Sequence, residues 1–353
     1  MDTRAESIYD RLLREGRIED EAFATLITAA MHDDELYRVL CHGTMHAATD
    51  KHLGGKRVYL RALIEISSYC RANCLYCGLR RDNRAAARYR LTEQEIIESC
   101  HKAYALGLRT FVLQGGEDGA WSDERLVPLI RTIRQEFPEA AVTLSLGERG
   151  EASYRALYEA GASRYLLRHE AADRGLYESL HPAPASYEGR MQAIEQLMRA
   201  GYQTGVGMMV GVPGQSIDHL ASDLRFIAHI RPQMIGIGPF IPCHNTPFEG
   251  KEAGSTRLTL IAIAIARLCV PNALIPATTA LATQLEDGDL KGLLAGANVL
   301  MPNFSPLRVQ GDYAIYDNKS LWSVGSQVDI DRLAARLDTI GCKIDFSRGD
   351  YTE

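Results

Sequence analysis

The sequence predicts an α/β fold, a (β/α)8 TIM-type barrel with a helical extension before it and a helical tail after it. Eight short runs rich in apolar and β-branched residues alternate with amphipathic helical segments. Most runs are nearly continuous in apolar residues, as expected for parallel strands covered on both faces. The alternation covers roughly 250 residues, the usual size of such a barrel. A doubly wound open sheet is the alternative, and the count of eight strands favours the barrel.

The elements follow one another in a regular order. Thr92, with Glu95 three residues later, forms a capping box that predicts the start of a helix, and Gly107 is placed to end it. We expect the helical extension to span residues 1–55, the barrel 56–310 and the tail 311–353, with a tail helix in "DIDRLAARLDTIG". The predicted strands are residues 59–67, 110–116, 141–147, 164–170, 204–211, 234–240, 273–279 and 298–304.

Composition excludes several classes of function. The formal net charge is −6, which argues against a general nucleic-acid-binding protein. The longest apolar run begins at Leu260 and is too short to span a bilayer, and the charged N-terminus has no apolar secretory segment. The eight cysteines show no disulfide framework. We therefore expect a cytoplasmic protein that does not act at a membrane.

Three of the cysteines stand close together in "ISSYCRANCLYCGLRRDN". Cys70, Cys74 and Cys77 have the spacing C-x3-C-x2-C and directly follow the first predicted strand. In a barrel this is the first loop on the catalytic face. Three thiolates can hold three irons of a [4Fe–4S] cluster and leave the fourth iron open. A zinc site lacks a second pair of ligands here, and a disulfide with a spare thiol is unexpected in a reducing compartment.

The cysteine motif, with Tyr76 before its last cysteine, resembles that of the radical S-adenosylmethionine (radical SAM) superfamily. The segments "VLQGGED", "RYLLRHE", "GMMVGVPGQ" and "IPATTA" extend the likeness, and together they resemble the [FeFe]-hydrogenase maturases of that superfamily from about residue 58 to residue 303. The resemblance implies a [4Fe–4S] cluster and S-adenosylmethionine as cofactors. It also implies an iron complex carrying cysteine, carbon monoxide and cyanide as substrate.

The resemblance further implies partners. These are other hydrogenase maturation proteins and a flavodoxin or ferredoxin as electron donor, for which the five arginines of residues 80–90 are a possible docking patch. Two other functions stay open. One is a radical SAM mutase or sulfur-inserting enzyme of the methylornithine synthase or biotin synthase type. The other is a zinc-stabilised barrel that binds a ligand without catalysis.

Residue roles carried over from the family concern first the second cofactor. Gly115, Gly116 and Glu117 match the segment that receives the amino group of S-adenosylmethionine. Glu170 matches an acid that binds the ribose. The remaining cofactor-binding residues are Arg190 for the carboxylate, Met209 on the adenine side and Tyr76 beside the adenine.

The substrate cavity is expected inside the barrel, facing the cluster. Arg168 is a charge within a predicted strand, so it points into the barrel or needs a partner. Thr278 and Thr279 end the seventh predicted strand, where two hydroxyls suit an anion or a polar ligand. The full set of predicted cavity residues is Thr143, Arg168, Met234, Thr278, Thr279, Met301, Tyr313 and Tyr316.

Overall fold

The computed structural model describes residues 3–51 and 56–352. The predicted end of the helical extension, at residue 55, lies outside the described residues. The predicted division between barrel and tail at residue 310 falls directly after a short helix, α13 (Leu307–Gln310). Both domain boundaries stay predictions.

The centre of the molecule is a parallel sheet that closes into a barrel. Among the described residues its six strands lie in the order of the chain: β2 (Ala62–Ser67), β3 (Thr110–Gly115), β4 (Ala141–Ser145), β5 (Ala162–Leu166), β6 (Gln203–Val210) and β7 (Met234–Pro239). Single parallel bridges then run from Met234 to Leu274, from Pro276 to Val299, and from Asn303 back to Leu63 in β2. The ring is thereby complete, and the predicted barrel is confirmed.

The first predicted strand, residues 59–67, is wrong as a single element. It divides at Arg61 into β1 (Arg57–Leu60) and β2. β1 pairs with β8 (Val299–Leu300) and with β9 (Lys343–Asp345), which the sequence did not predict. β1 alternates between buried and more exposed residues, whereas β2 is buried throughout. No glycine or proline separates them in the sequence, so the run alone does not reveal that they join different sheets.

The last two predicted strands are shorter than expected. Residues 273–279, all of them described, form bridges at Leu274 and Pro276 but no continuous strand. Proline has no N–H to donate to a ladder, and Thr278 already caps the next helix, α11 (Thr279–Gln284). Residues 298–304 form β8 and a bridge at Asn303, with Pro302 interrupting the pairing for the same reason.

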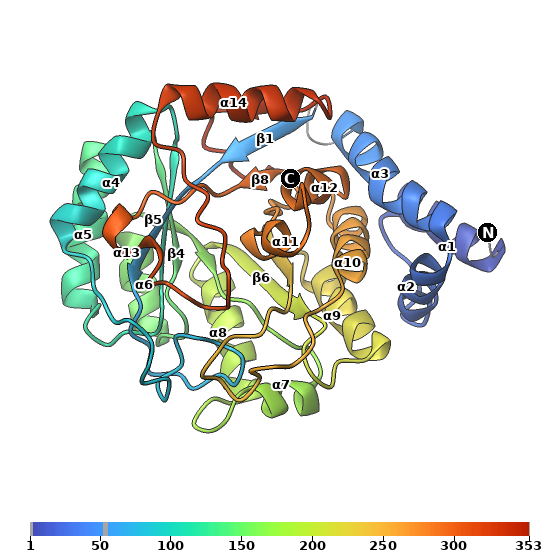
Figure 1. Cartoon of the computed structure of the whole chain (residues 1–353), viewed down its shortest axis with the longest axis horizontal. Coiled ribbons are helices and arrows are strands. Elements are labelled where there is room, and N and C mark those ends of the chain that lie inside the picture. The colour runs from blue at the N-terminus through green and yellow to red at the C-terminus, as the bar shows by residue number, and fades with distance from the viewer. Residues whose placement is uncertain (1–2, 52–55, 353) are drawn as a thin grey trace.

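Helices surround the strands, as Figure 1 shows. The predicted capping box is confirmed at α4 (Glu93–Ala105), where Thr92 and Glu95 exchange side-chain-to-backbone hydrogen bonds, and Gly107 follows the helix with a φ of 91°. The other helices of the barrel layer are α5 (Asp123–Glu136), α6 (Glu151–Glu159), α7 (Arg174–Leu180), α8 (Tyr187–Arg199), α9 (Ile217–Ile230), α10 (Thr256–Cys269), α11 and α12 (Gly288–Leu294).

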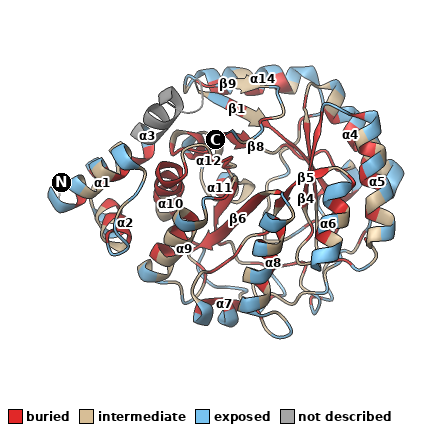
Figure 2. Ribbon diagram, turned by 180° about the vertical axis from the view of Figure 1, so that it is seen from behind, coloured by how far each residue is buried: buried red, intermediate tan, exposed pale blue. Residues whose placement is uncertain are grey.

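The long apolar run beginning at Leu260 is α10. Residues 259–269 are all buried because the helix lies between the barrel and the N-terminal helices α1 (Thr3–Glu15), α2 (Ala22–His32) and α3 (Asp34–Lys51). Figure 2 shows α10 in the colour of buried residues. A helix that is apolar on all sides belongs in such a core. None of the described helices is long and apolar enough to cross a membrane.

The C-terminal tail returns to the barrel. Its predicted helix is α14 (Gln327–Asp338), which runs beside β1 in Figure 1. Further along, the carbonyls of Arg348 and Gly349 accept hydrogen bonds from buried Arg164. Asp350 forms an ion pair with the same guanidinium at 2.7 Å. The hydroxyl of Thr110, the first residue of β3, also donates to the Arg348 carbonyl at 2.9 Å, so the tail covers the end of the barrel where the strands begin.

Replacing Ile263 of α10 with alanine tests this packing. Ile263 has no exposed surface, so Ile263→Ala should lower the free energy of unfolding by about 2–5 kcal/mol. Val328→Ala, at a helical position that is 56% exposed, is the matched control and should change it by less than about 0.5 kcal/mol. Denaturant unfolding of both variants measures the difference. Equal effects would contradict a core position for α10.

Candidate active site

The three cysteines lie in the loop that follows β2, at the end of the barrel where the strands finish. All three are free thiols of intermediate exposure. Burial raises the pKa of Cys77 to about 12, and it also raises the pKa values of Cys70 and Cys74, with neighbouring thiols adding to the effect at Cys74 and Cys77. The thiols are therefore protonated near neutral pH without a metal, and metal binding must displace their protons.

Arg88 holds the two ends of the cysteine loop together. One of its terminal nitrogens donates to the Ser68 carbonyl at 2.5 Å and to the Leu79 carbonyl at 2.9 Å. The other donates to Arg80 O at 2.8 Å and to Asn83 O at 3.1 Å. Ser68 precedes the first cysteine and the other acceptors follow the third. One guanidinium thus fixes the shape of the loop, a role that the sequence did not predict.

Gly116 allows the loop after β3 to approach the cysteine loop closely. A Cβ at this position would lie 2.3 Å from the Tyr69 carbonyl oxygen and 2.7 Å from the Cβ of Cys70. Only glycine fits such a contact without movement of the backbone. The two glycines predicted beside the cofactor therefore lie next to the cysteine loop, with Gly115 ending β3.

Glu117 connects three loops. Its carboxylate accepts hydrogen bonds from the backbone N–H of Glu148 at 2.9 Å and from Arg71 Nε at 3.0 Å. Its own N–H donates to the sulfur of Cys70 at 3.3 Å. Each carboxylate oxygen keeps acceptor capacity beyond these contacts. The structure shows that the Glu117 side chain joins the loop after β4 to the cysteine loop. Its contact with the amino group of S-adenosylmethionine stays a prediction.

Glu170 has the features of a ligand-binding acid. Its φ is 65°, in the left-handed region that non-glycine residues rarely occupy, at a cost of about 1–3 kcal/mol. One carboxylate oxygen accepts from Arg168 Nε at 3.0 Å, and the other is buried without a hydrogen-bond partner among the described residues. Burying an unpaired carboxylate oxygen is costly, so this oxygen is suited to the hydroxyl donors of a bound sugar.

Arg190 lies near the start of α8 and points toward the loops that follow β4 and β5, at the end of the barrel where the strands finish, which we call the rim. Its Nε donates to Glu148 Oε1 at 2.5 Å, and one terminal nitrogen donates to the Arg168 carbonyl at 2.6 Å. A guanidinium carries five N–H donors in a fork that matches a carboxylate. These two contacts leave donors for the carboxylate of a ligand, as the family resemblance implies.

Tyr76 and Met209 meet in one small apolar cluster with Phe240. The Tyr76 hydroxyl lies 2.9 Å from His181 Nε2, and His181 Nδ1 lies 2.8 Å from the Tyr177 carbonyl. A carbonyl only accepts, so Nδ1 carries the ring proton and Nε2 accepts from Tyr76. Tyr76 and Met209, the two residues predicted beside the adenine, thus lie in the same cluster. His181, which the sequence did not predict as a site residue, contacts Tyr76 there.

Two predicted cavity residues line the inner wall of β7. A Cβ at Gly236 would lie 3.6 Å from Arg168 Cδ, and one at Gly238 would lie 2.8 Å from Thr278 Oγ1. Glycine at position 238 makes room for Thr278, whereas a Cβ at position 236 would only be in ordinary contact with Arg168. Thr279 directly follows as the first residue of α11.

Other predicted cavity residues lie deeper in the barrel. Met234 begins β7 and packs with Leu274 and Val299, at the end opposite the cysteines, and Met301 packs against the same cluster. Thr143 lies in β4 with a buried hydroxyl that has no hydrogen-bond partner in the described part of the chain. These residues do not lie beside the cysteine loop, and their contact with a substrate stays a prediction.

Tyr313 and Tyr316 come from the tail, which crosses the mouth of the barrel. The carbonyl of Ile315, between them, accepts from the N–H of Gly78 at 3.0 Å, next to Cys77. The tail is also tied to β2 by an ion pair between Lys319 and Glu65, which are both buried. A carboxylate inside an apolar strand was the sequence signal for this pair, and we did not use it.

Fewer of the five arginines of the predicted docking patch are exposed and free of buried contacts than the sequence suggested. Arg88 is committed to the cysteine loop, and Arg90 forms a two-contact ion pair with Asp118, at 2.6 and 3.0 Å. Arg81 and Arg84 are exposed. Arg80 is half-buried, so the docking surface for an electron donor stays a prediction centred on Arg81 and Arg84.

The metal that fits the cysteines is a cluster of several ions. In the part of the chain that the structure describes, no three His, Cys, Asp or Glu side chains converge on the position of a single ion. A four-iron cluster does not require that convergence, because each cysteine ligates a different iron. The three thiols, the close glycine contacts and the unpaired oxygen of Glu170 all fit a cluster with a bound second cofactor.

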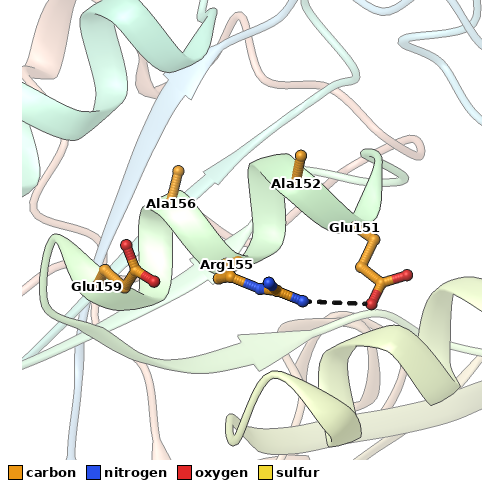
Figure 3. Close-up of a pocket in the computed structure, with 5 residues that line it drawn as sticks. All are labelled: Glu151, Ala152, Arg155, Ala156 and Glu159. Carbon is orange, nitrogen blue, oxygen red and sulfur yellow. Dashed lines mark ion pairs between the residues drawn. The ribbon is translucent and has the colours of Figure 1, made fainter.

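A surface depression of about 400 Å³ lies elsewhere, on the outer side of α6 (Figure 3). Its side chains are Glu151, Ala152, Arg155, Ala156 and Glu159, with an ion pair between Arg155 and Glu151. The depression contains none of the residues described above, so it does not belong to the candidate active site.

Comparison with known proteins agrees with this geometry. Residues 64–227 match the family model of the radical SAM superfamily. The chain is 45% identical over 265 residues to "[FeFe] hydrogenase maturase subunit HydE" of Thermotoga maritima, covering 75% of each chain. It is 32% identical over 267 residues to a 3-methylornithine synthase of Methanosarcina acetivorans, covering 74% of this chain and 75% of the relative. The solved structure of methylornithine synthase (PylB) superimposes with a TM-score of 0.81 at 28% identity, covering 96% of this chain and 97% of the other.

Replacing Arg88 with lysine tests the role of the guanidinium in the cysteine loop. Lysine keeps the charge but cannot reach four carbonyls, so Arg88→Lys should weaken metal retention by about 10–100-fold. Iron and sulfide per chain are measured after anaerobic reconstitution and exposure to a chelator. Arg81→Lys, at an exposed arginine of the same segment, is the control and should behave as the wild type. Equal retention by all three proteins would refute the role of Arg88.

The neutral state of His181 gives a pH prediction. Burial, assisted by the positive charge of Arg190, lowers the pKa of His181 from 6.5 to about 4. The unfolded chain therefore binds this proton first, and stability falls as the pH is lowered from about 7 toward 4. Between pH 7 and pH 5 we expect His181 to contribute a loss of about 2 kcal/mol. Urea unfolding at both pH values should show this difference in the wild type, and His181→Gln should lack it.

Proposed function

Because the chain belongs to the radical SAM superfamily, we propose that it is a maturase-type enzyme whose active site is the rim described above. Its cofactors are a [4Fe–4S] cluster and S-adenosylmethionine. Cys70, Cys74 and Cys77 would hold the cluster. The observation that carries the proposal is the 45% identity to a hydrogenase maturase subunit over 75% of the chain.

S-adenosylmethionine would be held by side chains from successive loops. Arg190 would bind its carboxylate through the donors that Glu148 and the Arg168 carbonyl leave unused. Glu170 would bind the ribose with its unpaired oxygen, and Tyr76 and Met209 would lie beside the adenine. With both cofactors bound, this site would supply the one-electron chemistry that cleaves S-adenosylmethionine reductively.

The chain's own residues orient the ligand and shield it. Arg88 and Glu117 fix the loops that present the cysteines, so that little rearrangement is needed on binding. The apolar cluster around Met209 and Phe240 would exclude water from the side of the adenine. Positioning of this kind can lower the barrier of a reaction without any protein group taking part in bond breaking.

The substrate we propose is an iron complex that carries cysteine, carbon monoxide and cyanide, an intermediate in assembly of the diiron subcluster of [FeFe]-hydrogenase. The remaining N–H donors of Arg168 and the hydroxyls of Thr278 and Thr143 would give the barrel interior the hydrogen-bond donors that a cyanide-bearing complex needs. Other hydrogenase maturation proteins would then be partners, and a flavodoxin or ferredoxin would supply electrons in the cytoplasm.

A methylornithine-type mutase is the second candidate. Two observations favour it: the 32% identity to a 3-methylornithine synthase and the TM-score of 0.81 to a solved structure of such an enzyme. That reaction requires an organic amino acid in the barrel, where the first candidate requires a metal complex.

Cleavage of S-adenosylmethionine is the test of the enzyme class. We expect the reconstituted wild type, with dithionite, to form 5′-deoxyadenosine, and Cys70→Ser to form less by about a hundredfold or more, because one iron loses its ligand. Iron content is measured in parallel. A wild type that assembles the cluster but forms no 5′-deoxyadenosine, even with substrate present, would contradict the assignment.

The substrate is tested separately, in a defined maturation mixture. Activity of an [FeFe]-hydrogenase that appears only when the wild-type protein is added would support the maturase. Conversion of lysine to methylornithine by the protein alone would instead establish the second candidate.

A further inference from the structure

The segment that follows β5 turns very sharply at Glu170. The N–H of Ala171 donates to the carbonyl of His169 at 2.9 Å, a hydrogen bond that closes a three-residue turn around Glu170. With a φ of 65° at the central residue, this is the rare and strained form of the γ-turn. Such a conformation persists only where surrounding contacts enforce it.

His169 is one of those contacts. It is completely buried, and its Nδ1 accepts from the N–H of Gly207 in β6 at 3.3 Å. Nδ1 therefore carries no proton, and the proton lies on Nε2. That nitrogen lies 3.3 Å from the Oδ1 atom of Asp223, an electrostatic contact, and it forms no hydrogen bond with any described residue.

Asp223, in α9, is the second contact. It too is completely buried, and its Oδ1 accepts from the N–H of Ala172 at 2.6 Å. Its other oxygen has no hydrogen-bond partner among the described residues. Burying a carboxylate in this way is unfavourable, and an amide or hydroxyl would satisfy the same N–H at lower cost. The side chain is therefore kept for its contacts with Ala172 and His169 rather than for packing.

We propose that Asp223 is a positioning residue for S-adenosylmethionine: through His169 and Ala172 it holds both sides of the turn that aims Glu170 at the cofactor. The carboxylate contacts the residue before Glu170 and the second residue after it, so the turn cannot relax on either side. Asp223 does not itself touch the cofactor. This inference rests on the proposed role of Glu170 in binding the ribose.

The consequence is a selective effect on binding. Once the turn relaxes, Glu170 leaves the left-handed conformation and its unpaired oxygen no longer faces the site. The cysteines are held by other contacts, chiefly those of Arg88, and so the chemistry at saturating cofactor should persist. A purely structural carboxylate would instead affect stability or kcat without this selectivity.

The test is a double-mutant cycle between Asp223 and Glu170 in the reconstituted protein. The Kd for S-adenosylmethionine is measured by calorimetry without reductant, and KM and kcat for its cleavage are measured with dithionite. Asp223→Ala should raise Kd and KM by about tenfold and change kcat by less than about threefold. Asp223→Asn keeps an acceptor for Ala172 and should recover most of the affinity. Asp218→Ala, at an exposed acid of α9, should match the wild type.

The cycle decides between a shared and a separate role. If Asp223 acts through Glu170, Asp223→Ala should change the Kd by less than about twofold in a Glu170→Gln background. The inference would be overturned if the increase in Kd of the double variant equalled the product of the increases in the two single variants. A loss of kcat with unchanged Kd would overturn it as well. Both results would leave the proposed function intact.

Two further outcomes are assigned in advance. If Glu170→Gln alone binds the cofactor as the wild type does, the proposed role of Glu170 fails and the inference fails with it. If Asp223→Ala does not fold, Asp223→Ser takes its place. The serine side chain is one bond shorter than that of aspartate, so its hydroxyl does not reach the N–H of Ala172. The same expectations and the same refuting results then apply.

Discussion

The parallel closure of the barrel is the constraint on which the rest of the structure depends. In a ring of parallel strands all the strands finish at one rim, so loops that are far apart in the chain meet there. The cysteine loop follows β2, Glu117 follows β3, Glu148 follows β4 and Glu170 follows β5. A single break in strand order would separate these side chains by the width of a strand or more.

Charged side chains then join these loops into one unit. Glu117 binds the N–H of Glu148, Glu148 binds Arg190, and Arg190 binds the carbonyl of Arg168, whose guanidinium binds Glu170. Each contact is short and partly buried, where charge-assisted hydrogen bonds are stronger than in water. A cofactor that meets Arg190 at one end and Glu170 at the other would therefore bind to a rim that is already arranged for it.

Sequence reasoning was most successful where the signal is local. The capping box of Thr92 and the three cysteines need only a few neighbouring residues to be interpreted, and both lie as expected. The eightfold rhythm was sufficient for the barrel, but not for the division at Arg61, because no glycine or proline marks the boundary between β1 and β2. Pro276 was the sequence signal that the seventh predicted strand would not form a continuous ladder, because proline has no N–H to donate.

The contacts that shape the candidate site were beyond sequence reasoning for a different reason. Arg88 was one of five arginines in a segment that reads as an exposed loop, and only the fold reveals that four carbonyls converge on it. His169 and Asp223 are more than fifty residues apart in the chain, and nothing local to either residue points to the other. Pairings at such separations depend on how helices pack on strands, which hydrophobic patterning does not specify.

The most direct measurement is electron paramagnetic resonance of the reduced, reconstituted protein with and without S-adenosylmethionine. We propose above all that the three cysteines ligate three irons of a [4Fe–4S] cluster and leave the fourth iron open to that cofactor. The prediction is a signal of a reduced [4Fe–4S] cluster whose g-values shift when S-adenosylmethionine is added, and do not shift with S-adenosylmethionine in a protein whose Arg190 is replaced by methionine. A cluster signal that is indifferent to S-adenosylmethionine in the wild type, or a colourless protein that contains zinc, would contradict it.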